Sequence, residues 1–163
     1  MEFIKVSLED KESIKELSAL ASSIVKEHYD PIVGSVQNDY MIEKFQSVSS
    51  LEEQIEHGYQ YYFVRDNKDN IGFLAFYKRE SELYLSKFYL SKTQRGKGLS
   101  KKMLDFVILN ARKINAHAIT LNVNKKNSAV YVYEKLGFCK KYEEKNDIGN
   151  GYFMDDYVYE YKL

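Results

Sequence analysis

The sequence predicts an α/β fold of the α+β mixed-sheet kind, with one central, mostly antiparallel sheet and helices packed against it. Three observations predict this fold. Runs rich in aromatic and β-branched residues alternate with amphipathic helical patterns. Three of these strand-like runs, between residues 61 and 90, precede a turn that carries Gly96 and Gly98. A helical pattern and a further apolar strand follow the turn, which is the order of a right-handed crossover between two parallel strands.

Length and composition indicate one globular domain that spans residues 1–163. The chain is 44% hydrophobic and 29% charged, and it has one proline. It contains no run of about 18 apolar residues, and Met1 leads straight into EFIKVSLED without the pattern of a signal peptide. We therefore expect a cytoplasmic protein with no membrane partner. The single cysteine, Cys139, excludes an intrachain disulfide, and we expect it to be a buried, inert thiol.

Charge is distributed unevenly although the net charge is zero. Residues 1–60 hold 5 basic and 12 acidic residues, residues 91–141 hold 12 and 2, and residues 142–163 hold 2 and 6. A neutral chain argues against a nucleic-acid partner. The basic middle segment favours a polyanionic ligand and the acidic first third a cationic one, although a solvated surface would produce the same counts.

The first third is predicted to be one short strand and three helices. A strand over residues 2–6 is followed by a helix that Ser7 caps, with Asp10 three residues later, and that ends before Pro31. Residues 28–35 are expected to form a turn-rich loop. Two further helices are predicted over residues 36–46 and, capped by Ser49, over residues 49–56.

The remaining elements alternate between strands and helices. A hairpin at DNKDN joins two aromatic strands, and a third strand runs to Leu90. Two helices, a buried strand between them and a closing antiparallel pair follow, and the closing pair surrounds a polar turn that ends in GNG. The predicted ranges are strands 61–65, 71–78, 82–90, 118–123, 138–142 and 152–163, and helices 99–113 and 128–136.

The glycine turn between residues 91 and 99 is suited to hold a pyrophosphate. Gly96 and Gly98 can adopt positive φ and let the backbone approach a ligand closely. Successive N–H groups in such a turn, followed by a helix N-terminus, form an anion site. The surrounding charges agree, because residues 92–102 carry five basic residues and no acid: Lys92, Arg95, Lys97, Lys101 and Lys102. A plain strand-to-helix turn is the alternative.

Two motifs in this order resemble the signatures of the GCN5-related N-acetyltransferases (GNAT). QRGKG at residues 94–98 is similar to Q/R-x-x-G-x-G/A, and NSAVYVYEKLGF at residues 127–138 is similar to the second signature, an Asn followed by Tyr, Lys and Gly-Phe. The resemblance covers nearly the whole chain and is looser toward small bacterial polyamine-type members. It implies a sheet of about six to seven strands with a splayed parallel pair at its centre and helices on both faces.

The resemblance also implies acetyl-CoA as cosubstrate and no metal. The pyrophosphate would lie on the backbone N–H groups of the glycine turn, the pantetheine arm beside the strand before it, and Asn127 would hydrogen-bond the arm, cap its helix, or do both. Lys97, Lys101 and Lys126 would support phosphates or simply face solvent. The residues expected to contact the cofactor are Phe88, Tyr89, Leu90, Gln94, Arg95, Gly96, Lys97, Gly98, Leu99, Ser100, Asn127 and Tyr133.

The resemblance implies a reaction in which a neutral amine attacks a thioester. Tyr133 matches the family tyrosine that protonates the leaving thiolate; the alternative is a packed aromatic residue, and Tyr131 is the control. Glu82 aligns approximately with a glutamate that some members use as a base, although it is equally a solvated turn residue and many members need no dedicated base. A backbone N–H near Tyr89 or Leu90 is the expected oxyanion donor. The three histidines, His28, His57 and His117, are candidates only by type.

The acceptor is predicted from charge. Acids in the first third favour a small cationic amine such as a polyamine, while a peptide amine stays open; these acids are Glu27, Asp30, Asp39 and Glu43. A non-catalytic acyl-CoA-binding module of the same fold is the alternative function. A Rossmann-type nucleotide-binding domain is disfavoured because no GxGxxG follows the first strand. The sequence leaves a homodimer through the aromatic final strand open.

Overall fold

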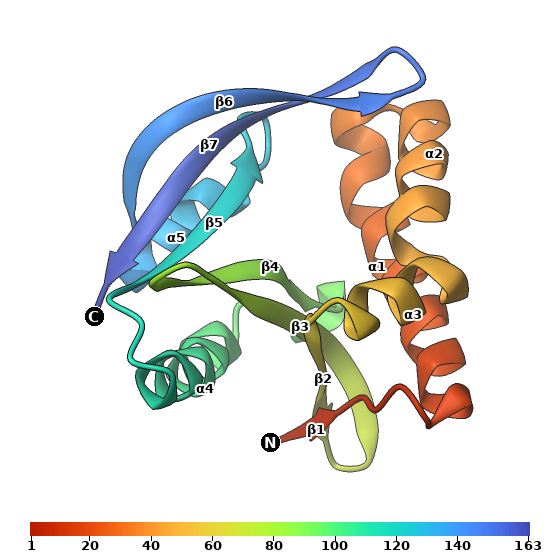
Figure 1. Ribbon diagram of the computed structural model, residues 1–163. Coiled ribbons are helices and arrows are strands. Elements are labelled where there is room, and N and C mark those ends of the chain that lie inside the picture. The colour runs from red at the N-terminus through yellow and green to blue at the C-terminus, as the bar shows by residue number, and fades with distance from the viewer. The chain divides into compact units, whose positions relative to one another are not determined.

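A computed structural model describes all 163 residues of the chain (Figure 1). The chain divides into two compact units, of which unit 1 comprises Met1–Tyr77 with Lys87–Leu99 and unit 2 comprises Lys78–Ser86 with Ser100–Leu163. Its elements are β1 (Glu2–Lys5), α1 (Lys11–Val33), α2 (Ser35–Gln46), α3 (Val48–Glu56), β2 (Gln60–Asp66), β3 (Asp69–Arg79), β4 (Glu82–Leu90), a 3₁₀ turn η1 (Lys92–Gln94), α4 (Leu99–Lys113), β5 (Ala118–Asn124), α5 (Ala129–Leu136), β6 (Cys139–Gly149) and β7 (Tyr152–Lys162).

The strands form a seven-stranded mixed sheet, which confirms the predicted fold class. Hydrogen-bonded neighbours follow the order β1-β2-β3-β4-β5-β7-β6. β1 with β2, β2 with β3, β5 with β7 and β6 with β7 are antiparallel. β4 and β5 are parallel, as the strand–helix–strand order predicts.

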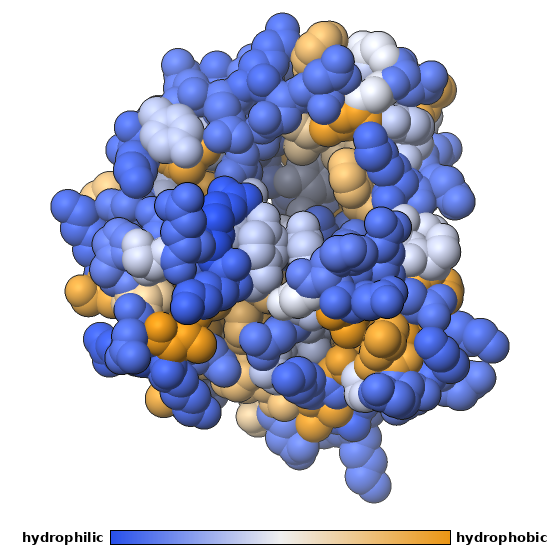
Figure 2. All heavy atoms as spheres, in the orientation of Figure 1, coloured by the Kyte–Doolittle hydropathy of each residue, from blue (hydrophilic) through white to orange (hydrophobic).

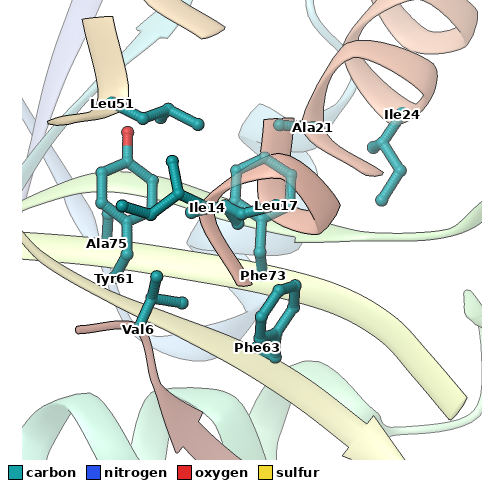
Figure 3. Close-up of a cluster of buried hydrophobic side chains, with 10 residues drawn as sticks. All are labelled: Val6, Ile14, Leu17, Ala21, Ile24, Leu51, Tyr61, Phe63, Phe73 and Ala75. Carbon is teal, nitrogen blue, oxygen red and sulfur yellow. The ribbon is translucent and has the colours of Figure 1, made fainter. Parts of the chain in front are cut away.

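Unit 1 is a β-meander covered by helices. The hairpin between β2 and β3 turns at Asn67 and Lys68, whose φ angles of 48° and 71° are those of a type I′ turn. α1 packs on the sheet through a stripe of apolar residues at helical spacing (Figure 3). The stripe meets aromatic side chains of β2 and β3, and the cluster contains Val6, Ile14, Leu17, Ala21, Ile24, Leu51, Tyr61, Phe63, Phe73 and Ala75.

Helix ends in unit 1 differ from the prediction in three places. Asp10, not Ser7, caps α1, because its Oδ1 accepts the Ser13 N–H at 3.1 Å. α1 also continues through Pro31 to Val33, so the loop predicted at residues 28–35 is wrong. Pro31 lies in the last turn, where its missing N–H removes one bond, and the buried stripe continues to Tyr29. Likewise Ser47, not Ser49, caps α3.

Unit 2 is built on β5, β7 and β6. β6 and β7 form a long curved hairpin (Figure 1), and β6 runs from Cys139 to Gly149 rather than ending at residue 142. Cross-strand pairing with β7 extends the polar half of β6, and Asn150 and Gly151, both at positive φ, make the turn. Cys139 is exposed, so the expected buried thiol is wrong. Cys139 is the first residue of β6, whose side chains are mostly exposed. The preceding residue, Phe138, is buried, and because successive side chains of an extended segment point to opposite sides, the thiol points to solvent.

On the face drawn in Figure 2, hydrophobic residues occur only as separate small groups among hydrophilic ones. No helix combines the length and the hydropathy that crossing a bilayer requires.

Candidate active site

The glycine turn has the geometry that the sequence predicts. β4 ends at Leu90, η1 follows, and Gly96 and Gly98 have φ angles of 76° and 75°. An L side chain is strained at such angles, although no atom lies within 4 Å of an ideal Cβ at either position. α4 begins directly afterwards at Leu99, and the first N–H groups of a helix have no partner inside it. The turn therefore offers backbone donors and open space to an anion.

Side chains of the turn are fixed by local contacts. Arg95 Nε donates to the carbonyl oxygen of Leu90 at 3.2 Å, and its backbone N–H donates to Lys92 O at 3.3 Å. Lys97 Nζ donates to Gln94 Oε1 at 3.3 Å. These exposed cations supply positive charge beside the two glycines. In unit 2, Lys101 forms an ion pair with Asp105 at 2.6 Å, which reduces the charge that it offers a phosphate.

Gly72 on β3 positions the end of β4, a role that the sequence reasoning missed. A Cβ at Gly72 would lie 2.3 Å from the carbonyl oxygen of Tyr89 and 3.1 Å from Leu90 Cδ2. The Tyr89 ring stacks on Phe73 with centroids 5.3 Å apart and contacts His28 at 6.4 Å. An isolated glycine inside a strand pattern is the signal for such a close backbone approach.

Lys87 is the last β4 residue before this segment. Its side chain is half-buried, and its Nζ lies 6.0 Å from the centroid of the Phe45 ring. Burial lowers the pKa of Lys87 to about 8, so near neutral pH part of the population is uncharged.

In unit 2, the loop between β5 and α5 is organised by two asparagines. Asn124 Oδ1 accepts the Lys126 N–H and Asn127 Oδ1 accepts the Ala129 N–H, each at 2.9 Å. Asn127 is buried and accepts the N–H of the first residue of α5, while Ser128 occupies the N-cap position, and the contact of Asn127 with the cofactor stays a prediction. Lys126, in the same loop, is exposed.

Tyr133 lies on the half-buried face of α5, with its ring 5.7 Å from that of Phe138. Tyr131 is 74% exposed and points elsewhere, as expected for the control. This contact fits a packed aromatic residue. The role of the Tyr133 hydroxyl as the acid that protonates the thiolate stays a prediction.

Glu82 stands at the first residue of β4, opposite Ala118 at the first residue of β5. Its carboxylate accepts the Thr120 hydroxyl at 3.1 Å, and Lys141 Nζ lies 3.9 Å away. Glu82 precedes the segment expected to line the thioester, Phe88 to Leu90, by six residues or more. Its role as the base stays a prediction.

His57 and His117 each place a ring nitrogen within hydrogen-bond distance of a backbone carbonyl oxygen. His57 Nδ1 lies 2.7 Å from Glu53 O, and His117 Nδ1 lies 2.8 Å from Ser81 O. Both side chains are exposed, so each contact is explained by local structure.

A carboxylate network, consisting of Asn122, Glu144 and Asp156, lies on one face of β5, β7 and β6. Asn122 Nδ2 donates to Glu144 Oε2 at 3.1 Å and to Asp156 Oδ2 at 3.3 Å, while Asn122 Oδ1 accepts the Tyr84 hydroxyl at 2.9 Å. Asp156 is only 4% exposed, and its Oδ1 has no hydrogen-bond partner. The sequence reasoning missed this network, although alternation in β7 places Asp156 on the same face as the buried Val158.

The Asp156 carboxyl is ionised near neutral pH although its buried environment favours the protonated form. Burial raises the pKa of its carboxyl to about 6, and the charges of Glu144 and Asp155 add to that rise. The hydrogen bond from Asn122 opposes it. Because perturbed buried carboxyls concentrate at functional sites, the network is a candidate part of the active site.

Acids of the first third are less available than their sequence suggests. Lys26 Nζ lies 3.1 Å from Asp30 and 3.0 Å from Asp39, and Asn38 Nδ2 donates to Asp30 at 2.8 Å. Glu27 and Glu43 are exposed and have no ion pair. The charge of the predicted acceptor region in unit 1 is thus partly neutralised.

Residues 19–154 match the family model described as Acetyltransferase (GNAT) domain. The PaiA N-acetyltransferase of Thermoplasma acidophilum, solved in complex with coenzyme A, is similar over 100% of both chains, with 22% identity and a TM-score of 0.79. A GNAT-family acetyltransferase from Staphylococcus aureus Mu50 is 21% identical over 99% of this chain and 98% of its own, with a TM-score of 0.69.

A spermidine N-acetyltransferase chimera of Vibrio cholerae SpeG and hSSAT is 18% identical over 99% of this chain and 94% of its own, with a TM-score of 0.67. At these identities the likeness of the solved structures concerns the fold. No curated protein matches the chain in sequence.

Gly98→Ala is expected to weaken coenzyme A binding by at least roughly tenfold in calorimetric titration, because the Cβ forces the N–H groups of the turn out of their positive-φ geometry. Gly58→Ala is the matched control, since Gly58 also has positive φ (103°) and open space around its Cβ position but lies after α3. Equal losses of affinity in the two variants would contradict an anion site at the turn.

Asp156→Asn is expected to stabilise the protein above pH 6. A carboxyl whose folded-state pKa is raised from 3.8 to about 6 contributes stability below pH 4 and loses it as the pH rises through 6. The amide avoids that loss, so thermal unfolding at pH 7.5 should show a gain of up to about 3 kcal/mol, and the gain should vanish near pH 4. A variant less stable than the wild type at pH 7.5 would show that the carboxylate is satisfied.

Proposed function

The chain belongs to the GNAT acetyltransferase family, and on that premise we propose that it transfers the acetyl group of acetyl-CoA to a primary amine of a small cationic molecule such as a polyamine. Acetyl transfer with acetyl-CoA as donor is the activity of the family. The acceptor, the residue roles and the use of both units as one catalytic domain are the proposed part.

The glycine turn is the observation that carries the proposal. It places two positive-φ glycines between β4 and α4, with open space at both, and it is followed by a helix N-terminus. Acetyl-CoA supplies an activated acetyl thioester when it is bound. In the proposed complex, the N–H groups of Gly96 to Leu99 hold its pyrophosphate, and Gln94, Arg95 and Ser100 flank it. Phe88, Tyr89, Leu90 and Asn127 line the pantetheine arm.

The proton steps assign Tyr133 as acid. A neutral amine attacks the acetyl carbonyl, the carbon–sulfur bond breaks, and the Tyr133 hydroxyl gives its proton to the leaving thiolate. An N–H at Tyr89 or Leu90 stabilises the oxyanion. The new amide nitrogen loses its proton to water, which later restores the tyrosine. Glu82 remains a predicted acceptor of that proton, acting through water.

Charge supports a cationic acceptor. Residues 1–60 and 142–163 both carry an excess of acids, and the exposed Glu27 and Glu43 are not neutralised. The Vibrio cholerae chimera, which has the same fold, is a spermidine N-acetyltransferase by name. Such fields favour cationic substrates over neutral ones.

A panel of amines tests the acceptor. Coenzyme A release should be at least roughly tenfold more efficient in kcat/KM with spermidine than with glycinamide, because two or more ammonium groups gain from the acidic surface. Equal efficiency would contradict the cationic acceptor. Coenzyme A binding without turnover of any amine would identify an acyl-CoA-binding module instead.

Tyr133→Phe should lower kcat by about 10²-fold, because the variant loses the general acid but keeps the ring. Affinity for acetyl-CoA, measured by titration, should change little. Tyr131→Phe is the control and should match the wild type, since Tyr131 is exposed. Unchanged kcat in Tyr133→Phe would leave the residue a packing aromatic.

A further inference from the structure

The carboxylate network of Asn122, Glu144 and Asp156 contains negative charge that no cation of the chain neutralises through an ion pair, and the charge of Lys125 acts on Asp156 only from a distance. Asp156 is buried and its Oδ1 has no partner. The nearby Lys125 instead pairs with Glu143 at 3.1 Å and Asp155 at 3.0 Å. Burying a carboxylate costs free energy unless it is paired. A buried carboxylate oxygen without a hydrogen-bond partner therefore indicates that a cationic ligand binds there.

The pairing of β6 with β7 places a second carboxylate directly opposite Asp156. Glu144 of β6 and Asp156 of β7 are Cα partners, and like charges in such a pair destabilise a sheet. Asn122 links the two through the hydrogens of one amide nitrogen. Asn146 Nδ2 also donates to Glu144 Oε2, at 2.7 Å, so Glu144 is oriented as well as charged.

The donor pattern selects an ammonium group. Asn122 turns its Nδ2, not its oxygen, toward the carboxylates, because its Oδ1 accepts the Tyr84 hydroxyl. A metal ion would be repelled by that amide nitrogen, and the chain shows no group of three acidic, histidine or cysteine ligands. An alkylammonium brings three donors and one positive charge, which suit the buried, unpartnered Asp156 Oδ1 and the carboxylate of Glu144.

Within unit 2, the network lies close to the end of the parallel strand pair. Parallel pairing of β4 with β5 ends at Tyr84 and Thr120, and Asn122 follows two residues later. Ligands of α/β sheets bind beyond the carboxyl ends of parallel strands. Asp156 is the Cα partner of Asn124, whose loop leads to Asn127.

We propose that Asp156 and Glu144, oriented by Asn122, bind the non-reacting ammonium group of a diamine or polyamine acceptor. This assignment rests on the proposed function and narrows it: the preferred acceptor carries a second cationic nitrogen, and these side chains set that specificity. The charge of the second ammonium then offsets the repulsion between the two carboxylates.

Asp156→Asn tests the assignment with two amines of equal chain length, butane-1,4-diamine and butan-1-amine. We expect the ratio of KM for the diamine to KM for the monoamine to rise at least about tenfold, because only the diamine has the second charge. Glu144→Gln should shift the diamine KM in the same direction. Asp155→Asn is the matched control: Asp155 is the adjacent acid, pairs with Lys125 and is exposed.

Three results would overturn the assignment: an unchanged diamine KM in Asp156→Asn, an equal loss for both amines, or a loss of the same size in Asp155→Asn. Calorimetric titration of butane-1,4-diamine onto the coenzyme A complex separates the two proposals. If the wild type acetylates neither amine, the proposed function fails, yet diamine binding that Asp156→Asn abolishes would still support the ammonium site. Wild-type protein that acetylates monoamines but binds no diamine would overturn the site alone.

Discussion

The hydrogen bonds between β4 and β5 stop after three residue pairs, and the rest of the proposed chemistry depends on that limit. Glu82 to Tyr84 pair with Ala118 to Thr120, after which β4 continues to Leu90 without β5 as its partner. In the proposed complex the pantetheine arm would lie beside that second half, whose last carbonyl, that of Leu90, already accepts the Arg95 Nε–H. Gly72 fixes the same half from the other side, since its missing Cβ lets β3 approach Tyr89.

Beyond the last backbone pair of β4 and β5, the two strands are connected by a side-chain hydrogen bond. The Tyr84 hydroxyl holds Asn122, and Asn122 holds two carboxylates whose repulsion lowers the stability of the fold. An interior that evolved for stability alone would favour an amide or an apolar residue at Asp156. Buried carboxyls with a raised pKa are typical of functional sites, where the free energy of ligand binding offsets the loss of folding stability.

Periodicity and turn chemistry are sufficient to predict most of this fold. The parallel crossover, the hairpin at Asn67 and Lys68 and the glycine turn all follow from local patterns. Pro31 and the polar half of β6 do not, because tertiary packing of α1 and pairing with β7 override local preference there. Glu144 and Asp156, twelve residues apart, meet only through β6–β7 register. Lys26 pairs with Asp30 one helical turn away, which is a local pattern, but its pairing with Asp39 of α2 depends on tertiary packing. The sequence thus predicts the cofactor turn better than the acceptor site.

A crystal structure of the protein with coenzyme A and butane-1,4-diamine measures the central claim most directly. The account predicts pyrophosphate oxygens on the N–H groups of Gly96 to Leu99 and one diamine nitrogen within about 3.2 Å of Asp156 Oδ1. Pyrophosphate bound away from the glycine turn, or a diamine whose two nitrogens both avoid Asp156 and Glu144, would contradict it.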